Sequence, residues 1–164
     1  MTQVDKQIEW CLSKARKEGE KHKGLKKISP NKTKADEHIA KAKRNLRLVE
    51  RLIEIKYPDW AVSAIFYSMY HSLLAILWKF GYESKNQRCT FAVIEKLITG
   101  GKINISIDEL HDIKESSNDQ EGTVVEMREY YQYGTDTEVE MDKLRELQKR
   151  AKEFVAKVSV MLEE

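Results

Sequence analysis

An arginine and a tyrosine five residues apart form the part of this sequence that is closest to chemistry. Arg128 offers a fixed fork of charged donors that suits phosphate oxygens. The second residue of the pair, Tyr133, offers a hydroxyl donor and a stacking face. Because an unperturbed phenol has a pKa of about 10, Tyr133 is a poor general base, and the pair favours phosphate binding over catalysis.

Two further polar side chains lie on the least charged stretch of the chain. Tyr67 and His71 belong to residues 60–78, which contain no Asp, Glu, Lys or Arg. His71 is a candidate catalytic residue and RNA contact, and Tyr67 a candidate RNA contact. Each can equally be a hydrogen-bonded core or interface residue, and Arg128 can equally pair with a carboxylate. A lone membrane span would expose the polar side chains of this stretch to lipid, so we interpret it as a buried central helix.

Positive charge is concentrated in the N-terminal third of the sequence. Residues 1–56 hold 16 Lys/Arg against 8 Asp/Glu, a net charge of +8, whereas residues 57–164 hold 13 against 19, a net charge of −6. Such an asymmetry can bind the phosphates of nucleic acid, or it can be a solvated surface that complements an acidic one. The candidate RNA contacts in the basic segment are Lys23, Lys26 and Lys27.

The composition is typical of a helical protein with a single domain. Of 164 residues, 34% are charged and 41% apolar, with only 2 Pro and 7 Gly, which excludes collagen-like, disulfide-rich and low-complexity classes. Apolar residues at spacings of three and four predict an all-α protein, an up-down helical bundle of four to five main helices plus short helices. The expected helices cover residues 4–19, 33–56, 59–80, 87–99, 106–114, 124–133 and a last long segment that begins at Thr137-x-x-Glu140, a capping box. Residues 116–122 are expected to form a loop.

The two cysteines, Cys11 and Cys89, lack the spacing of a metal site or of a CxxC motif. We therefore expect no structural disulfide, no metal and a reducing, cytoplasmic location. The first residues reach a charge at once and lack the apolar run of a signal peptide, and we expect no membrane association.

One stretch of the expected central helix resembles a known family. It reads Ala61-Val-Ser-Ala-Ile-Phe-Tyr67-Ser-Met69-Tyr70-His71, which is similar to the Ala-x-x-x-Tyr-Tyr-Ala-Met-Phe-His signature of HEPN domains (higher eukaryotes and prokaryotes nucleotide-binding). Further matching signals follow in order: Gly81, Asn86-Gln87-x-Cys89-Thr90-Phe91, Arg128-x-x-x-x-Tyr133-Gly134 and Ala151-x-x-Phe154-Val155-x-x-Val158. The resemblance covers about residues 35–162.

The resemblance implies a HEPN-like bundle over residues 35–164, preceded by an N-terminal helix and basic connector over residues 1–34, in a single domain overall. It also implies a homodimer with a cleft between the subunits. Many HEPN domains are metal-independent RNases of toxin–antitoxin systems that cleave RNA with an Arg and a His four to six residues later. Others bind nucleotides or act as non-catalytic partners.

Because Tyr133 stands where the family's histidine would be, we expect a protein that binds a nucleotide or RNA phosphate without catalysis and without a cofactor. Two alternatives stay open. One is a degenerate RNase in which His71 replaces the missing base. The other is a structural partner of a small nucleotidyltransferase.

Overall fold

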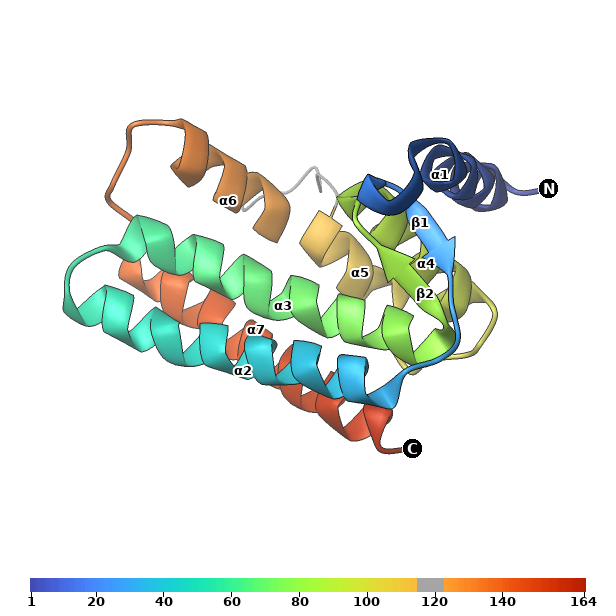
Figure 1. Ribbon diagram of the computed structural model, residues 1–164. Coiled ribbons are helices and arrows are strands. Elements are labelled where there is room, and N and C mark those ends of the chain that lie inside the picture. Colours follow the sequence, from blue (N-terminus) through green and yellow to red (C-terminus); the bar gives the residue numbers. More distant parts are fainter. Residues whose placement is uncertain (115–122) are drawn as a thin grey trace.

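The structure, a computed structural model, describes residues 1–114 and 123–164, and this part of the chain is almost entirely helical (Figure 1). Its helices are α1 (Gln3–Glu18), α2 (Lys32–Glu54), α3 (Pro58–Phe80), α4 (Gln87–Thr99), α5 (Ile107–Lys114), α6 (Val124–Tyr133) and α7 (Met141–Leu162). One turn of 3-10 helix, η1 (Gly19–Lys21), follows α1, and two short strands, β1 (Leu25–Lys27) and β2 (Tyr82–Ser84), pair with each other. The predicted all-α fold is confirmed; the loop expected over residues 116–122 lies outside the described residues.

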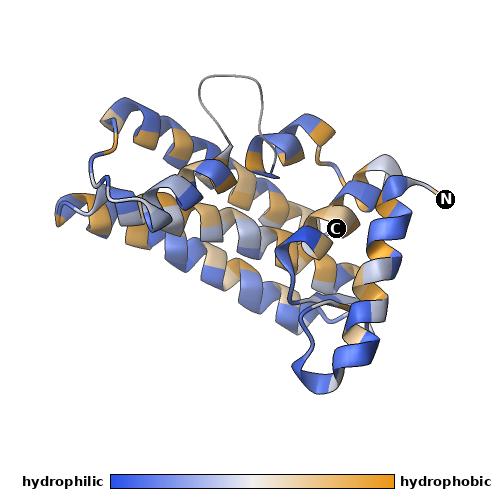
Figure 2. Ribbon diagram, turned by 90° about the horizontal axis from the view of Figure 1, so that it is seen from above, coloured by the Kyte–Doolittle hydropathy of each residue, from blue (hydrophilic) through white to orange (hydrophobic). Residues whose placement is uncertain are grey.

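The three longest helices, α2, α3 and α7, lie side by side and form the body of the molecule (Figure 1). α3 is the central element, because it contacts α2, α4, α6 and α7. It is also long and apolar enough to cross a membrane, yet 72% of its apolar window is buried by the other helices. Figure 2 shows polar residues along the outer sides of the long helices and apolar residues where the helices face one another. α3 is thus the buried central helix that its uncharged sequence predicts.

Local interactions at the helix ends account for several of the boundaries. A capping box stands at the start of α5: the Ser106 N–H donates to the Glu109 carboxylate and the Glu109 N–H donates to Ser106 Oγ. Gly81 ends α3 with a φ of 86°, in the left-handed conformation that glycine adopts at least cost. The predicted start of the last helix at Thr137 is wrong. There the Asp136 carboxylate accepts a hydrogen bond from the Glu138 N–H, and α7 begins only at Met141.

The N-terminal segment is attached to the body beside the C-terminal end of α3. β1 pairs antiparallel with β2, with Leu25 opposite Ser84, and neither strand was predicted. Three residues are too short a run for an alternating pattern to be recognised. Gly24 lets β1 approach α1 closely, because a Cβ at this position would lie 2.6 Å from the Cys11 carbonyl oxygen. His22 is fully buried; its Nδ1 accepts from the Gly24 N–H, and its Nε2–H donates to Glu83 Oε1 at 2.9 Å.

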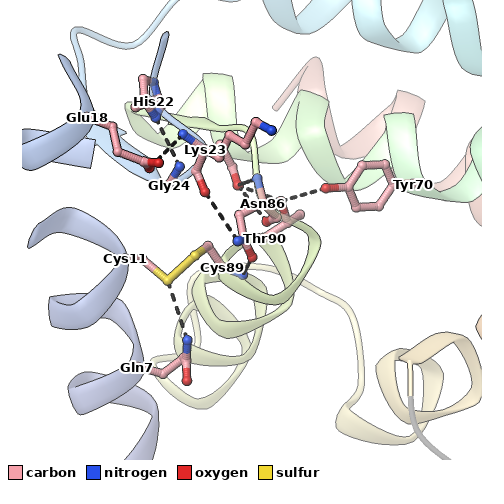
Figure 3. The surroundings of a disulfide bond; sticks show 11 residues. Gln7, Cys11, Glu18, His22, Lys23, Gly24, Tyr70, Asn86, Cys89 and Thr90 are labelled. Atoms are coloured by element: carbon pink, nitrogen blue, oxygen red, sulfur yellow. Dashed lines mark hydrogen bonds between the residues drawn. A yellow bond between two sulfur atoms is a disulfide. The ribbon is translucent and has the colours of Figure 1, made fainter. Parts of the chain in front are cut away.

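A disulfide joins Cys11 of α1 to Cys89 of α4 (Figure 3), so the expectation of no structural disulfide is wrong. The two residues are 78 positions apart, and only the packing of α1 on α4 brings them together. Spacing along the chain therefore could not reveal the pair.

Candidate functional site

Arg128 lies in the middle of α6 and turns its side chain towards α3. Its guanidinium carbon is 4.5 Å from the centre of the Phe66 ring and 6.0 Å from the centre of the Tyr67 ring. The guanidinium is therefore held on an aromatic surface, the arrangement of a cation–π contact. Only 7% of the residue is exposed. α6 and α3 together thus fix both the position and the plane of this cation.

Among the described residues, the groups around Arg128 balance its positive charge only weakly. Nη1 donates to Gln132 Oε1 at 2.6 Å, which is a neutral acceptor. The ion pair of Nη2 is with Glu129 Oε1 at 3.8 Å, and that carboxylate belongs to a half-exposed side chain. Within the part of the chain that the structure describes, Nε has no hydrogen-bond partner. A buried cation needs paired charge and hydrogen bonds to offset its desolvation, so Arg128 is suited to an added anion.

Tyr67 lies next to Arg128 on an uncovered side of α3. It is 40% exposed, and Trp60, seven residues earlier on the same face of the helix, is 58% exposed. His71 follows Tyr67 by four residues and continues this face. The face therefore presents two aromatic rings and an imidazole along about 16 Å of α3.

His71 pairs with a residue to which the sequence assigned no role, His38 of α2. The two Nδ1 atoms are 2.9 Å apart, so one imidazole donates and the other accepts. The rings are nearly parallel, with an interplanar angle of 22°. Burial, followed by the positive charges of His38 and Lys41, lowers the pKa of His71 to about 4. Burial and the charges of Lys41 and Lys34 also lower the pKa of His38.

Tyr133, the other half of the predicted pair, points away from Arg128's surroundings. It is the last residue of α6 and is 76% exposed. Its neighbour Tyr130 is also exposed and donates its hydroxyl to Asp136 Oδ2 at 3.0 Å. Among the described residues, the aromatic rings that form cation–π contacts with Arg128 are those of Phe66 and Tyr67, and not that of Tyr133.

The structure separates the three predicted lysines from Arg128. Lys23 and Lys27 are exposed, Lys26 is half-buried, and all three lie in or next to β1. β1 pairs with β2, just beyond the end of α3 (Figure 1), whereas Arg128 packs on Phe66 and Tyr67 in the first half of that helix. From Tyr67 to the end of α3 the helix rises about 20 Å. Tyr67, His71 and Arg128 therefore form one region, and the lysines form another.

The first region combines a cation, aromatic rings and an imidazole. In residues 1–114 and 123–164, no group of three or more His, Cys, Asp and Glu side chains could hold a metal ion. No hydrogen bond joins His71 to Arg128 among the described residues, since the partner of His71 is His38. Sequence reasoning missed His38 and Phe66. The one signal for Phe66 was its position beside Tyr67, and nothing in the sequence indicated that His38 meets His71.

Comparison with known proteins identifies the fold. The family model of the HEPN domain matches residues 35–161, which include α3, α6 and nearly all of α2 and α7. A search of curated proteins returns no match to the chain. α1, η1 and β1 lie outside the matched region.

Proposed function

Because the chain belongs to the HEPN domain family, and because that membership indicates a function related to nucleotides or RNA, we propose that it binds a nucleotide or RNA through a phosphate group without cleaving it. The observation that carries this proposal is the buried, weakly balanced guanidinium of Arg128 on the rings of Phe66 and Tyr67. A phosphate oxygen at the edge of this group would accept the charge-assisted hydrogen bonds that its protein neighbours supply only in part.

The neighbouring aromatic ring fits the rest of such a ligand. Tyr67 is 40% exposed and lies beside the Arg128 guanidinium. Exposed aromatic rings are surfaces on which bases of single-stranded nucleic acid stack. A phosphate at Arg128 would place the attached nucleoside within reach of Tyr67.

Two features support binding without cleavage. Tyr133 replaces the family's histidine, and its side chain is directed to solvent at the end of α6. His71, the alternative base, has a pKa of about 4 and shares a hydrogen bond with His38. An imidazole whose conjugate acid is that strong removes a proton from a ribose hydroxyl poorly.

We also propose that the chain forms a homodimer through α2 and α3. Leu48 and Ile55 are exposed on one side of α2, seven residues apart, and Trp60 is exposed near the start of α3. In Figure 1 no other described helix lies in front of α2 and α3. Exposed apolar surface of this kind is typical of an interface, and a second copy would also narrow the space around Arg128. A small nucleotidyltransferase is the alternative occupant of this surface.

Location in the cytoplasm remains a prediction. The disulfide between Cys11 and Cys89 argues for a more oxidising compartment, because such bonds are rare in the reducing cytosol. Alkylation of the free thiols in freshly lysed cells decides the question. Labelling of both cysteines supports a reducing location, whereas the absence of any labelled cysteine contradicts it.

The proposed site is tested by titrating the protein into a fluorescently labelled single-stranded RNA and following the anisotropy. We expect Arg128→Lys, which keeps the charge but loses the planar fork, to weaken binding by about 1–3 kcal/mol, or about 5- to 150-fold. The matched control is Arg51→Lys on α2, an exposed arginine that pairs with Glu54. Equal affinities for Arg128→Lys and the wild type would place the site elsewhere.

A further inference from the structure

We propose that Cys11 and Cys89 form a reversible thiol–disulfide site that a dithiol reductant opens, releasing α1 from the HEPN domain. The inference rests on the attachment of the N-terminal segment and not on the proposed ligand. It assigns a reaction to the two cysteines of the chain, which the family match does not explain, since Cys11 lies before residue 35.

The disulfide joins the added N-terminal segment to the matched domain. Cys11 belongs to α1, outside the matched region, and Cys89 belongs to α4, inside it. α1 packs on α4, β1 and η1, and it buries only four side chains: Ile8, Cys11, Leu12 and Ala15. The noncovalent links of the segment include the short β1–β2 ladder, the ion pair of Asp5 in α1 with Lys96 in α4, and the bond from His22 to Glu83. The Asn86 amide also donates to the Lys23 carbonyl oxygen (Figure 3). The disulfide adds a covalent bond to these contacts, and with its loss α1 keeps the Asp5 ion pair and few buried apolar side chains.

The two sulfur atoms have different surroundings, and these determine which sulfur a thiolate attacks and which one leaves. Cys89 is the third residue of α4, in the first helical turn, and its N–H donates to the Oδ1 of Asn86, the N-cap residue. The positive end of a helix stabilises a thiolate there. Cys11 lies in the middle of α1, without that stabilisation, and its Sγ accepts a weak hydrogen bond from Gln7 Nε2 at 3.6 Å. Cys89 is therefore the better leaving group.

The reaction follows from this difference. The thiolate of an external dithiol attacks Sγ of Cys11, the bond between Cys11 and Cys89 breaks, and Cys89 leaves with the electron pair as a thiolate. The second thiol of the reductant then attacks its own sulfur in the mixed disulfide and expels Cys11, which takes up a proton. Two electrons pass from the reductant, which ends as a disulfide, to the protein, which ends with the Cys11 thiol and the Cys89 thiolate.

Access to the bond requires α1 to move first. Both cysteines are completely buried, and the half-buried Gln7 lies over Cys11 (Figure 3). Local opening of a helix held by few apolar contacts costs less than unfolding of the whole domain. At high reductant concentration, the rate of reduction should therefore reach the rate at which α1 opens and stop rising.

The test uses the full chain in glutathione buffers of increasing oxidised fraction, with thiols counted by alkylation and mass spectrometry. We expect two free thiols at the reducing end, none at the oxidising end and the same curve in both directions. Hydrogen exchange of the α1 amides should be at least about tenfold faster in the reduced protein, while amides in the middle of α3 stay unchanged. The variant with both Cys11→Ser and Cys89→Ser should exchange as the reduced protein does in either buffer.

The direction of cleavage is read from the trapped mixed disulfide. After a short exposure to glutathione and an acid quench, peptide mapping should find the adduct on Cys11. An adduct on Cys89 would overturn the assignment of the leaving group. Any of three results would overturn the proposal. The thiols could stay free in oxidised glutathione, or dithiothreitol could fail to reduce the bond in the folded protein. The third is hydrogen exchange in α1 at the same rate in the oxidised and the reduced protein. Because the wild type supplies these readouts, a variant that fails to fold does not remove the test.

Discussion

The hydrogen-bonded pair of His38 and His71 makes the stability of the protein depend on pH in a way that can be calculated. The pKa of His71 is about 4 in the folded protein, whereas a histidine without neighbouring groups has a pKa of 6.5. Above pH 6.5 both the folded and the unfolded chain carry the neutral imidazole, so the residue has no effect. Between pH 6.5 and 4 the unfolded chain binds a proton that the folded chain does not. Stability therefore falls as the pH falls through this window.

The size of the effect follows from the shift and from solvent access. At about pH 5, the full shift corresponds to a loss of about 2 kcal/mol in the free energy of unfolding. The ring is only half-buried, so we discount this to about 1 kcal/mol for screening by water. For a chain of this length, that loss lowers Tm by about 2–4 °C. The charges of Lys34 and Lys41 favour the neutral pair, and Glu37 opposes them at His38.

The assay is thermal unfolding followed by circular dichroism at about pH 7.5 and about pH 5. His71→Gln keeps a hydrogen-bonding partner for His38 but no longer titrates. The drop in Tm between the two pH values should be about 2–4 °C smaller in this variant than in the wild type. Lys149→Gln changes an exposed side chain of α7 instead and leaves both histidines in place, so its drop should equal that of the wild type. An equal drop in all three proteins would refute the reasoning.

Three further outcomes follow from the site and the surface charge. Light scattering at micromolar concentration should give the mass of a dimer, and a wild-type mass of about 19 kDa would contradict the proposed interface. Trp60→Glu should shift the protein towards the monomer, because a charge would enter that interface. Replacing Lys23, Lys26 and Lys27 with Gln should flatten the salt dependence of RNA binding by up to about three units of slope, whereas an unchanged slope would return these residues to a solvated surface. Tyr133→Phe should change affinity less than Arg128→Lys does, as measured by the same anisotropy titration, because its hydroxyl lies far out in solvent; a larger effect would move the site to the end of α6.

The helices could be predicted because each carries its own apolar stripe. Ile39, Ala42 and Val49 of α2 are buried as their spacing indicates, and the uncharged run of α3 is the centre of the core. The start of α7 could not be predicted, because Thr137 and Glu140 have the spacing of a capping box, yet the Asp136 side chain bonds the backbone of Glu138. The prediction failed here because the capping-box pattern and the Asp136 hydrogen bond involve the same short stretch of backbone.

The sequence could indicate single residues of the site but not the contacts between them. The sequence pointed to Arg128 because of its type and its resemblance to the family, but its burial on Phe66 depends on how α6 packs against α3. His38 meets His71 only because α2 and α3 run antiparallel, and Cys11 meets Cys89 only because α1 packs on α4. Contacts between residues 33 or 78 positions apart leave no trace in a single sequence.

The central claim, binding at Arg128 without cleavage, is tested most directly by following binding and integrity of one RNA sample. Labelled single-stranded RNA is titrated with wild-type protein in metal-free buffer, its anisotropy is recorded, and the same samples are then resolved on a denaturing gel. We expect saturable binding that Arg128→Lys weakens about 5- to 150-fold, with full-length RNA recovered at every concentration. RNA that is cleaved by the wild type and spared by His71→Gln would contradict the account and establish the RNase alternative.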